Sequence, residues 1–542
     1  MHYEILRGLY LGESSNADLS STEVRERLHV ATPLDDLIPS LVAQGRDVVL
    51  TGNPGDGKSH LVRQIMDRGL LKSAEVELDL SAHPDEEVIA RWRAARRLGR
   101  PFVLCANQGP LMLLVEGIGD DPELTDAARE LSGQLGRLIS PHPDRIAPEP
   151  REAALLDLAD RNLLNETLIG QAINRVAHVD FLPPGFSGAD TSAGQNLMLL
   201  VEAPEARQRL GRLVAFAGRR LGEHVTFRHL WQCIAYGITA GKAVSTLNQE
   251  LSTGKIGLGH YPLDHLAARR GQGPLVDAVR RFADPGVHSD PDMDEDLWTT
   301  GQPRKGRWIF DPGVIEAPAT IWGETAAAQQ RALDQLAAIK RLVALAHELG
   351  DEMITRIVAS GDAAIDRDDE EIVDEVLGGI SALYLPPGER AGAPSWLCEG
   401  LPLWIGQSYE HRPVSSRPHV TVSTAEAAEF RLLRPTRASW LGDAMGPPPC
   451  EAWLLHKPSN CTLRIDSDLL TLLRRAAQTD GPLEPPESIQ RFLSKLAGFH
   501  EKRPEFVFGH DMFAVLDQPR GHLVAAASIS TLSEGGARYG SH

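Results

Sequence analysis

The sequence predicts an α/β protein: a parallel sheet with flanking helices comes first, a helical lid follows, and a mixed α+β domain ends the chain. An apolar run at 47–50 leads into a glycine-rich loop and then a helical pattern that stops at Gly69. Strand-like runs then alternate with helical patterns to about residue 158, as in a parallel sheet covered on both faces. From about 196 to 350 the patterns are helical, and from about 360 they are mixed.

The length of 542 residues indicates more than one domain. We expect three: a core at 1–180 with an insertion near 118–150, a helical lid and linker region at 181–355, and a mixed α+β interaction domain at 356–542.

The composition is that of a soluble globular protein, with 42% hydrophobic and 24% charged residues. We see no apolar run that could span a bilayer and no signal-peptide pattern, and so expect a cytoplasmic protein that contacts no membrane. The five cysteines form no C-x-x-C pair, so free thiols are expected. The net charge of −19 opposes nonspecific attraction to nucleic acid, although a local basic groove would still allow it.

The glycine-rich loop matches G-x-x-x-x-G-K-[ST], the phosphate-binding P-loop pattern. Its glycines let backbone N–H groups surround phosphate oxygens, and the following helix adds the positive end of its dipole. Lys58 would reach the β- and γ-phosphates of ATP, and the Ser59 hydroxyl would hold Mg²⁺. The expected nucleotide-binding residues are Gly52, Asn53, Pro54, Gly55, Asp56, Gly57, Lys58, Ser59 and His60.

Around this loop the core elements follow in order. A helix through 37–42 precedes the strand that leads into the loop. The other expected core elements are a strand at 75–80, a helix from 83 to 98, strands at 102–106 and 153–158, and a helix inside the 118–150 insertion.

ATP hydrolysis also needs an acid at a strand end to hold Mg²⁺. Asp79, on the next strand along the chain, is the first candidate for this role and for a metal ligand beside Ser59; Asp157 is the alternative. Either acid could instead cap the helix or loop that follows it.

Asn107 ends the apolar strand at 102–106, and an amide there can position an attacking water. Alternatively, this strand occupies the place of the Mg²⁺-binding strand, and Asn107-Gln108 then stands where Asp-Glu is usual. No carboxylate follows this strand to act as the base, so turnover stays an open question.

Two further arginines are candidates for the catalytic site. Arg161 follows the strand that contains Asp157 and could complete a neighbouring subunit's site, and Arg228 begins a lid helix and could contact the nucleotide. For each, the alternative is a surface salt bridge.

A basic cluster lies in the helix from 83 to 98 and just beyond it. It could contact a nucleic-acid backbone or a second subunit, or be a solvated helix face balanced by acids. Its members are Arg91, Arg93, Arg96, Arg97 and Arg100.

Beyond the core, the acidic stretch 290–296 lacks the glycine and glutamate of a calcium-binding loop and is expected to be a solvated loop. The last domain should hold strands at 419–422, 430–433 and 461–465, helices at 467–473 and 489–497, and a terminal hairpin at 513–525.

Several segments in this order resemble the AAA+-like ATPases of bacterial anti-phage DNA-defence systems, and most closely the DptF-type ATPase of phosphorothioation-dependent restriction. They cover roughly the first 240 residues: the P-loop, the strand ending in Asp79, the segments 106–111 and 156–161, and the segment 226–231, with a faint echo near 460–500. In that group the third segment usually reads Asn-Glu-Gly, whereas this chain has Gln108. The resemblance implies an oligomeric ATPase in a DNA-directed defence complex.

The sequence thus predicts an ATP-binding, ATP-hydrolysing subunit that couples nucleotide state to protein partners in anti-phage defence. The alternative is a nucleotide-dependent assembly switch with little turnover and no direct DNA contact.

Overall fold

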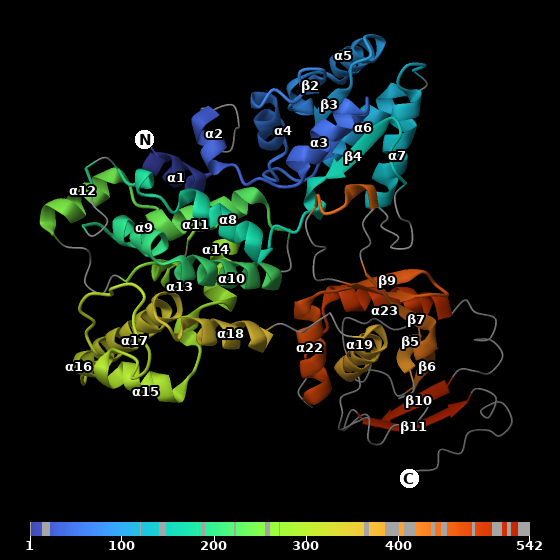
Figure 1. The fold of residues 1–542 in the computed structure, drawn as a ribbon. Coiled ribbons are helices and arrows are strands. Elements are labelled where there is room, and N and C mark those ends of the chain that lie inside the picture. Colours follow the sequence, from blue (N-terminus) through green and yellow to red (C-terminus); the bar gives the residue numbers. More distant parts are fainter. Residues whose placement is uncertain are drawn as a thin grey trace. The chain divides into compact units, whose positions relative to one another are not determined.

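The chain divides into two compact units, residues 1–360 with 436–449 and residues 361–435 with 450–542 (Figure 1). Residues 1–180 and 181–355, which we expected as separate domains, fall in the first unit. The computed structural model describes residues 2–12, 22–119, 121–139, 148–183, 185–186, 190–221, 224–254, 261–269, 271–361, 368–384, 400–405, 419–434, 439–445, 452–479, 483–500, 512–517 and 522–528.

A four-stranded parallel sheet forms the centre of the core, as the alternation of strands and helices predicts. Its strand order is β2-β3-β1-β4. Because Leu50 pairs with Cys105 and Thr51 with Asp157, the carboxyl ends of β1, β3 and β4 meet at one edge. The strands are β1 (Asp47–Thr51), β2 (Glu75–Glu77), β3 (Phe102–Cys105) and β4 (Ala153–Asp157).

Helices cover both faces of this sheet (Figure 1). Alternate side chains of a strand point to opposite faces, so Val48 and Leu50 meet α3 (Leu34–Ala43) and α4 (Lys58–Asp67), while Val49 packs on the other face. That other face is covered by α5 (Asp85–Arg97), α6 (Gln108–Ile118) and α7 (Thr125–Ile139).

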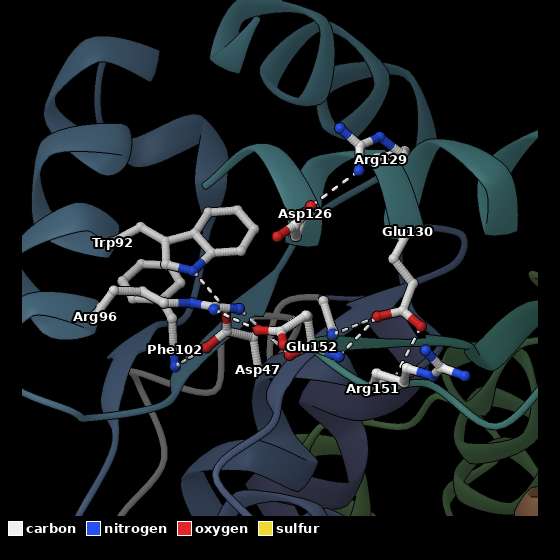
Figure 2. Close-up of polar contacts among 10 residues, drawn as sticks. Asp47, Trp92, Arg96, Phe102, Asp126, Arg129, Glu130, Arg151 and Glu152 are labelled. Carbon is white, nitrogen blue, oxygen red and sulfur yellow. Dashed lines mark hydrogen bonds and ion pairs between the residues drawn. The ribbon is translucent and has the colours of Figure 1, made fainter. Parts of the chain in front are cut away.

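A buried carboxylate fixes α5 to the sheet at the amino end of β1. Asp47, 1% exposed, accepts hydrogen bonds from Trp92 Nε1 and the Phe102 backbone N–H, each at 2.7 Å, and pairs with Arg96 (Figure 2). Burial raises the pKa of Asp47, although the charge of Arg96 counteracts this. Nearby, Glu130 accepts the backbone N–H of Glu152, which holds α7 against the start of β4 (Figure 2).

The rest of the first unit is helical and has its own apolar core. The amino-terminal helix α1 (His2–Leu11) belongs to this part, because Tyr10 stacks on Tyr236 of α11 with ring centroids 4.8 Å apart. The other helices are α2 (Thr22–Leu28), α8 (Glu166–Val176), α9 (Ser192–Glu202), α10 (Pro204–Arg220), α11 (Phe227–Thr239), α12 (Val244–Thr253), α13 (His265–Ala268), α14 (Pro274–Phe282), α15 (Pro291–Thr300), α16 (Pro318–Ile321), α17 (Ala326–Ala346) and α18 (Gly350–Gly361).

The acidic stretch 290–296 is not the loop that we expected. It begins α15, with Asp290 as the N-cap that accepts the Met293 N–H and Pro291 at the first helical position. Acids are favourable in the first turn of a helix, and Asp294 pairs with Lys340.

The second unit is mixed α+β, with antiparallel sheets ordered β11-β10-β6-β5 and β7-β8-β9. Its helices are α19 (Asp369–Tyr384), α22 (Ser467–Gln478) and α23 (Glu487–His500). Its strands are β5 (Gly400–Ile405), β6 (His419–Glu426), β7 (Phe430–Leu433), β8 (Ala452–His456), β9 (Cys461–Ile465), β10 (Met512–Asp517) and β11 (His522–Ser528). Among the described residues, no helix is both long and apolar enough to cross a membrane.

Candidate nucleotide-binding site

The glycine-rich loop joins β1 to α4 through left-handed backbone that only glycine adopts easily. Gly57 has φ +85° and is the N-cap of α4, which has no side-chain cap of its own. Gly55 has φ +99°, and a Cβ there would lie 3.0 Å from Arg228 Cβ. The loop therefore brings uncapped helix N–H groups to the sheet edge where β3 and β4 also end, which is the chemistry that binds phosphate.

Lys58 lies where the loop and β3 converge. Its Nζ donates to the backbone oxygens of Gly52 and Asn53, each at 3.0 Å, and to Asn107 Oδ1 at 2.9 Å. Burial lowers the pKa of Lys58, while the negative charges of Asp56, Asp157 and Asp79 raise it. The lysine is thus set among acceptors that phosphate oxygens can replace.

Ser59 lies beside the end of β2, next to the first candidate acid, Asp79, which caps the short 3₁₀ turn Leu80–Ala82. Ser59 Oγ donates to the Leu78 carbonyl at 2.8 Å, directly before Asp79. The Asp79 carboxylate accepts the Ser81 backbone N–H at 3.0 Å and the Ser81 hydroxyl at 2.5 Å. An oxygen-rich pair of this kind suits Mg²⁺, which usually takes one or two carboxylates and keeps several waters.

Asp157 also lies at this edge, at the end of β4. Its side chain accepts the Ala159 N–H at 3.0 Å and caps the short 3₁₀ turn that follows. Burial raises the pKa of Asp157, although this hydrogen bond lowers it. Both candidate acids act electrostatically on Lys58, but only Asp79 adjoins the carbonyl that Ser59 contacts.

Asn107 is the N-cap of α6 and presents its amide to the lysine, as predicted for a polar residue at the end of β3. Gln108 is exposed at the first position of α6. Among the described residues, the end of β3 has no carboxylate in the place of a catalytic base.

The start of α11 lies directly on the glycine loop. The backbone N–H of Arg228 donates to the Gly55 carbonyl at 3.2 Å, and Thr226 caps α11 with a capping box that includes His229. Within the described ranges, the Arg228 guanidinium forms no hydrogen bond or ion pair. Because Arg228 lies beside the loop, its guanidinium is available to bind an anion there.

Asp56 links the loop to the segment that precedes α11, and the sequence motif alone did not indicate this role. The side chain is fully buried; Oδ2 accepts the Asn53 N–H at 2.6 Å, and Oδ1 lies 2.7 Å from His224 Nε2. The sequence signal for this role was an acidic residue, Asp56, at a variable position of the motif. Its partner, His224, is far away in sequence and could not be identified from the motif.

Arg161 is held inside its own chain. Its guanidinium donates to the Asp56 carbonyl and lies over the Phe227 ring, 5.0 Å from the centroid. Burial lowers its pKa to about 10. Arg161 is 8% exposed, so it is neither the surface arginine nor the exposed finger that the sequence suggested, and it stabilises the contact between the loop and the start of α11.

His60, which we expected among the nucleotide-binding residues, has its side chain in a cluster behind the loop. Its Nε2 lies 3.4 Å from His29 Nδ1, and His29 Nε2 is 2.7 Å from a carboxylate oxygen of Asp35. Of His60, only the backbone N–H group, in the first turn of α4, remains available to the candidate site.

The five arginines of the basic cluster are each paired with acids of the same unit. Arg91 pairs with Glu75 and Glu77, Arg93 with Asp121, and Arg97 with Glu123. Arg96 pairs with Asp47 and Glu152, and Arg100 with Glu75. This arrangement favours a balanced helix face over the alternative of a nucleic-acid contact.

Comparisons of this chain with models of known protein families, with curated proteins and with solved structures found no match.

Proposed function

We propose that the protein binds a nucleoside triphosphate with Mg²⁺ at the glycine loop and hydrolyses it. The contacts of Lys58 carry this proposal, because its ammonium joins the loop carbonyls to the amide of Asn107 at the end of β3. A lysine that only supports the fold would not be expected beside uncapped helix N–H groups, a serine hydroxyl placed to bind Mg²⁺ and an acidic residue.

Each group has a role in the proposed reaction. The N–H groups of the loop and Lys58 hold the β- and γ-phosphates, and Ser59 with Asp79 holds Mg²⁺, which neutralises developing charge on the phosphates. Asn107 orients the attacking water, and Arg228 contacts the phosphates from the lid. Catalysis then consists of positioning and charge stabilisation.

Coupling to the second unit is supported by residues 439–445. Ala444 and Met445 of this segment are buried in the same apolar cluster as Leu61 and Ile65 of α4, the helix that begins at Lys58. The chain enters and leaves this segment from the second unit. A shift of α4 on nucleotide binding would therefore reach the second unit through covalent connections on both sides.

The resemblance to DptF-type ATPases suggests the setting: an oligomeric subunit, with protein partners, of a DNA-directed anti-phage defence complex. The paired state of the arginine cluster favours partners, rather than this helix, as the source of any DNA contact.

A nucleotide-dependent assembly switch is the second candidate. It is favoured by the exposed Gln108 where a base would stand, and by the direct contacts of His224 and Arg228 with the loop. In this case ATP would reposition the lid with little turnover.

The deciding experiment measures ATP binding and ATP turnover by the purified chain, with and without duplex DNA, for the wild type and Lys58→Ala. Lys72→Ala, at an exposed position, is the matched control. Loss of binding in Lys58→Ala alone supports the site, and equal binding by Lys58→Ala and wild type refutes it. Turnover that needs Lys58 supports the ATPase, whereas Lys58-dependent binding without turnover favours the switch.

A further inference from the structure

Two histidines and a glutamate of the second unit meet far from the glycine loop in sequence. Glu429 directly precedes β7, His456 ends β8, and His500 ends α23. The register pairs Phe430 with His456, so Glu429 lies beside the end of β8. One ligand atom from each of these three residues lies within 4.8 Å of the other two.

The separations suit a small cation. His456 Nε2 is 3.2 Å from Glu429 Oε2. Ligands at about 2.0–2.2 Å from a tetrahedral zinc lie roughly 3.3–3.5 Å apart, so these two atoms are already spaced as a ligand pair. The third donor atom, on His500, lies within 4.8 Å of the other two.

The surroundings are those of a protected site. His456 is fully buried and His500 is 3% exposed, while Glu429 keeps some contact with solvent. The rings of Phe430 and Phe499 pack around His456, with centroids 5.0 and 5.8 Å from its own. Two imidazoles and one carboxylate are donors typical of divalent metal sites, and the carboxylate offsets part of the charge of the metal.

A second group orients His456. Its Nδ1 is 2.7 Å from Ser459 Oγ, and that hydroxyl also accepts the Cys461 backbone N–H at 3.3 Å. The Ser459 backbone N–H also donates to Nδ1, at 3.3 Å, and in that tautomer Nε2–H donates to Glu429. Metal binding at Nε2 requires the other tautomer, in which Nδ1–H donates to Ser459 Oγ. A metal ion at Nε2 would take the place of the proton shared with Glu429, and metal-bound histidines commonly have a hydrogen-bond partner such as Ser459 on the second nitrogen.

We propose that Glu429, His456 and His500 bind a divalent first-row transition metal of the zinc or iron(II) class. Imidazole ligands select against the hard cations Mg²⁺ and Ca²⁺, and two histidines with one carboxylate leave a coordination position for water. The metal joins the end of α23 to the β7–β8 edge, so it stabilises the second unit whatever the state of the glycine loop.

The test begins with metal analysis for zinc and iron on the full chain, purified without a histidine tag. The chelator-treated protein is then titrated with Co²⁺, which reports its ligands by visible absorption. We expect about one Co²⁺ per chain, without the intense near-ultraviolet band of a thiolate ligand, and a higher melting temperature with bound metal. Zinc or iron in the protein as purified identifies the natural metal.

Glu429→Gln and His500→Gln should abolish the Co²⁺ spectrum, and Ser459→Ala should weaken binding about 10–100-fold. His347→Gln is the matched control, since His347 is also buried and packs edge-on against an aromatic ring, Trp308, with centroids 5.0 Å apart. Glu429→Gln keeps the shape of a partly exposed side chain, so it separates metal loss from misfolding. A Co²⁺ spectrum unchanged in the triad variants, or absent from wild type, overturns the proposal.

Discussion

The ammonium of Lys58 lies 2.9 Å from the amide oxygen of Asn107, and this hydrogen bond joins the glycine loop after β1 to the end of β3. The two residues are far apart in sequence, but parallel neighbouring strands end at the same edge. Phosphate bound in the loop would compete with Asn107 for the lysine. The amide would then be released towards the attacking water.

Asn107→Ala should therefore reduce ATP turnover by about 100-fold, the scale found when one positioned hydrogen-bonding group is removed from an active site. Affinity for ATP should change little, because Lys58 keeps the carbonyls of Gly52 and Asn53. Steady-state kinetics and equilibrium binding separate the two effects. If affinity and turnover fall together, Asn107 instead acts by holding Lys58 in position to bind ATP.

Gln108→Glu should raise turnover by about tenfold or more, because a carboxylate one residue beyond Asn107 can act as general base. The position is exposed at the start of α6, where a negative charge is also favourable, so the fold should tolerate the change. Gln108→Ala is the control without a carboxylate. No gain in Gln108→Glu would show that another group already activates the water.

The contact between Asp56 and His224 should control how firmly the segment before α11 is held against the glycine loop. His224→Ala removes the contact of this side chain with Asp56 and should increase backbone hydrogen exchange at the start of α11 without unfolding the core. His178→Ala, which alters an exposed histidine, is the control. If hydrogen exchange at α11 is unchanged, the Arg228 backbone hydrogen bond and the contacts of Arg161 are enough to hold α11 on the loop.

The sequence predicted the strand, glycine turn and helix of the candidate site well because the determinants of these elements are local. The β1 strand, the glycine turn and α4 follow one another directly, and parallel strand ends must bring Asp79, Asn107 and Asp157 to one edge. The Asp56–His224 contact could not be predicted in this way, since the two residues meet only when the lid packs on the loop.

The same limit explains the other differences. Arg161 looked like an exposed arginine because nothing in its neighbourhood indicates that Phe227 and the Asp56 carbonyl enclose it. The triad of Glu429, His456 and His500 has no sequence spacing typical of a metal site, as its members come from three separate elements.

Arg96→Ala should destabilise the first unit by about 3 kcal/mol, because it deprives the buried Asp47 carboxylate of its cation. Arg97→Ala is the matched control: Arg97 pairs with Glu123, its side chain is 64% exposed, and a surface pair contributes about 0–1 kcal/mol. Denaturant unfolding of both variants measures the difference. Equal, small losses would mean that Trp92 and Phe102 suffice to hold Asp47.

The stability of the first unit should fall as the pH drops from about 6.5 towards 4, owing to His60. Burial, with the positive charge of its neighbours, lowers the pKa of His60 to about 4 from an ordinary 6.5. Between these values the unfolded chain binds a proton that the folded chain refuses, so stability is full above 6.5 and decreases with acid. The pKa of Asp35 is also lowered, since hydrogen bonds from His29 and Thr32 outweigh its burial, but its contribution is lost only below its ordinary value of 3.8.

Melting temperatures at pH 7 and pH 5 therefore isolate His60 from Asp35. Wild type should lose more stability between these two pH values than His60→Gln, which cannot take up the proton. His178→Gln, with a side chain 54% exposed, should behave as wild type. An identical pH dependence in wild type and His60→Gln would show that His60 is protonated in the folded chain at pH 5, which the cluster of His29 and Arg25 around it opposes.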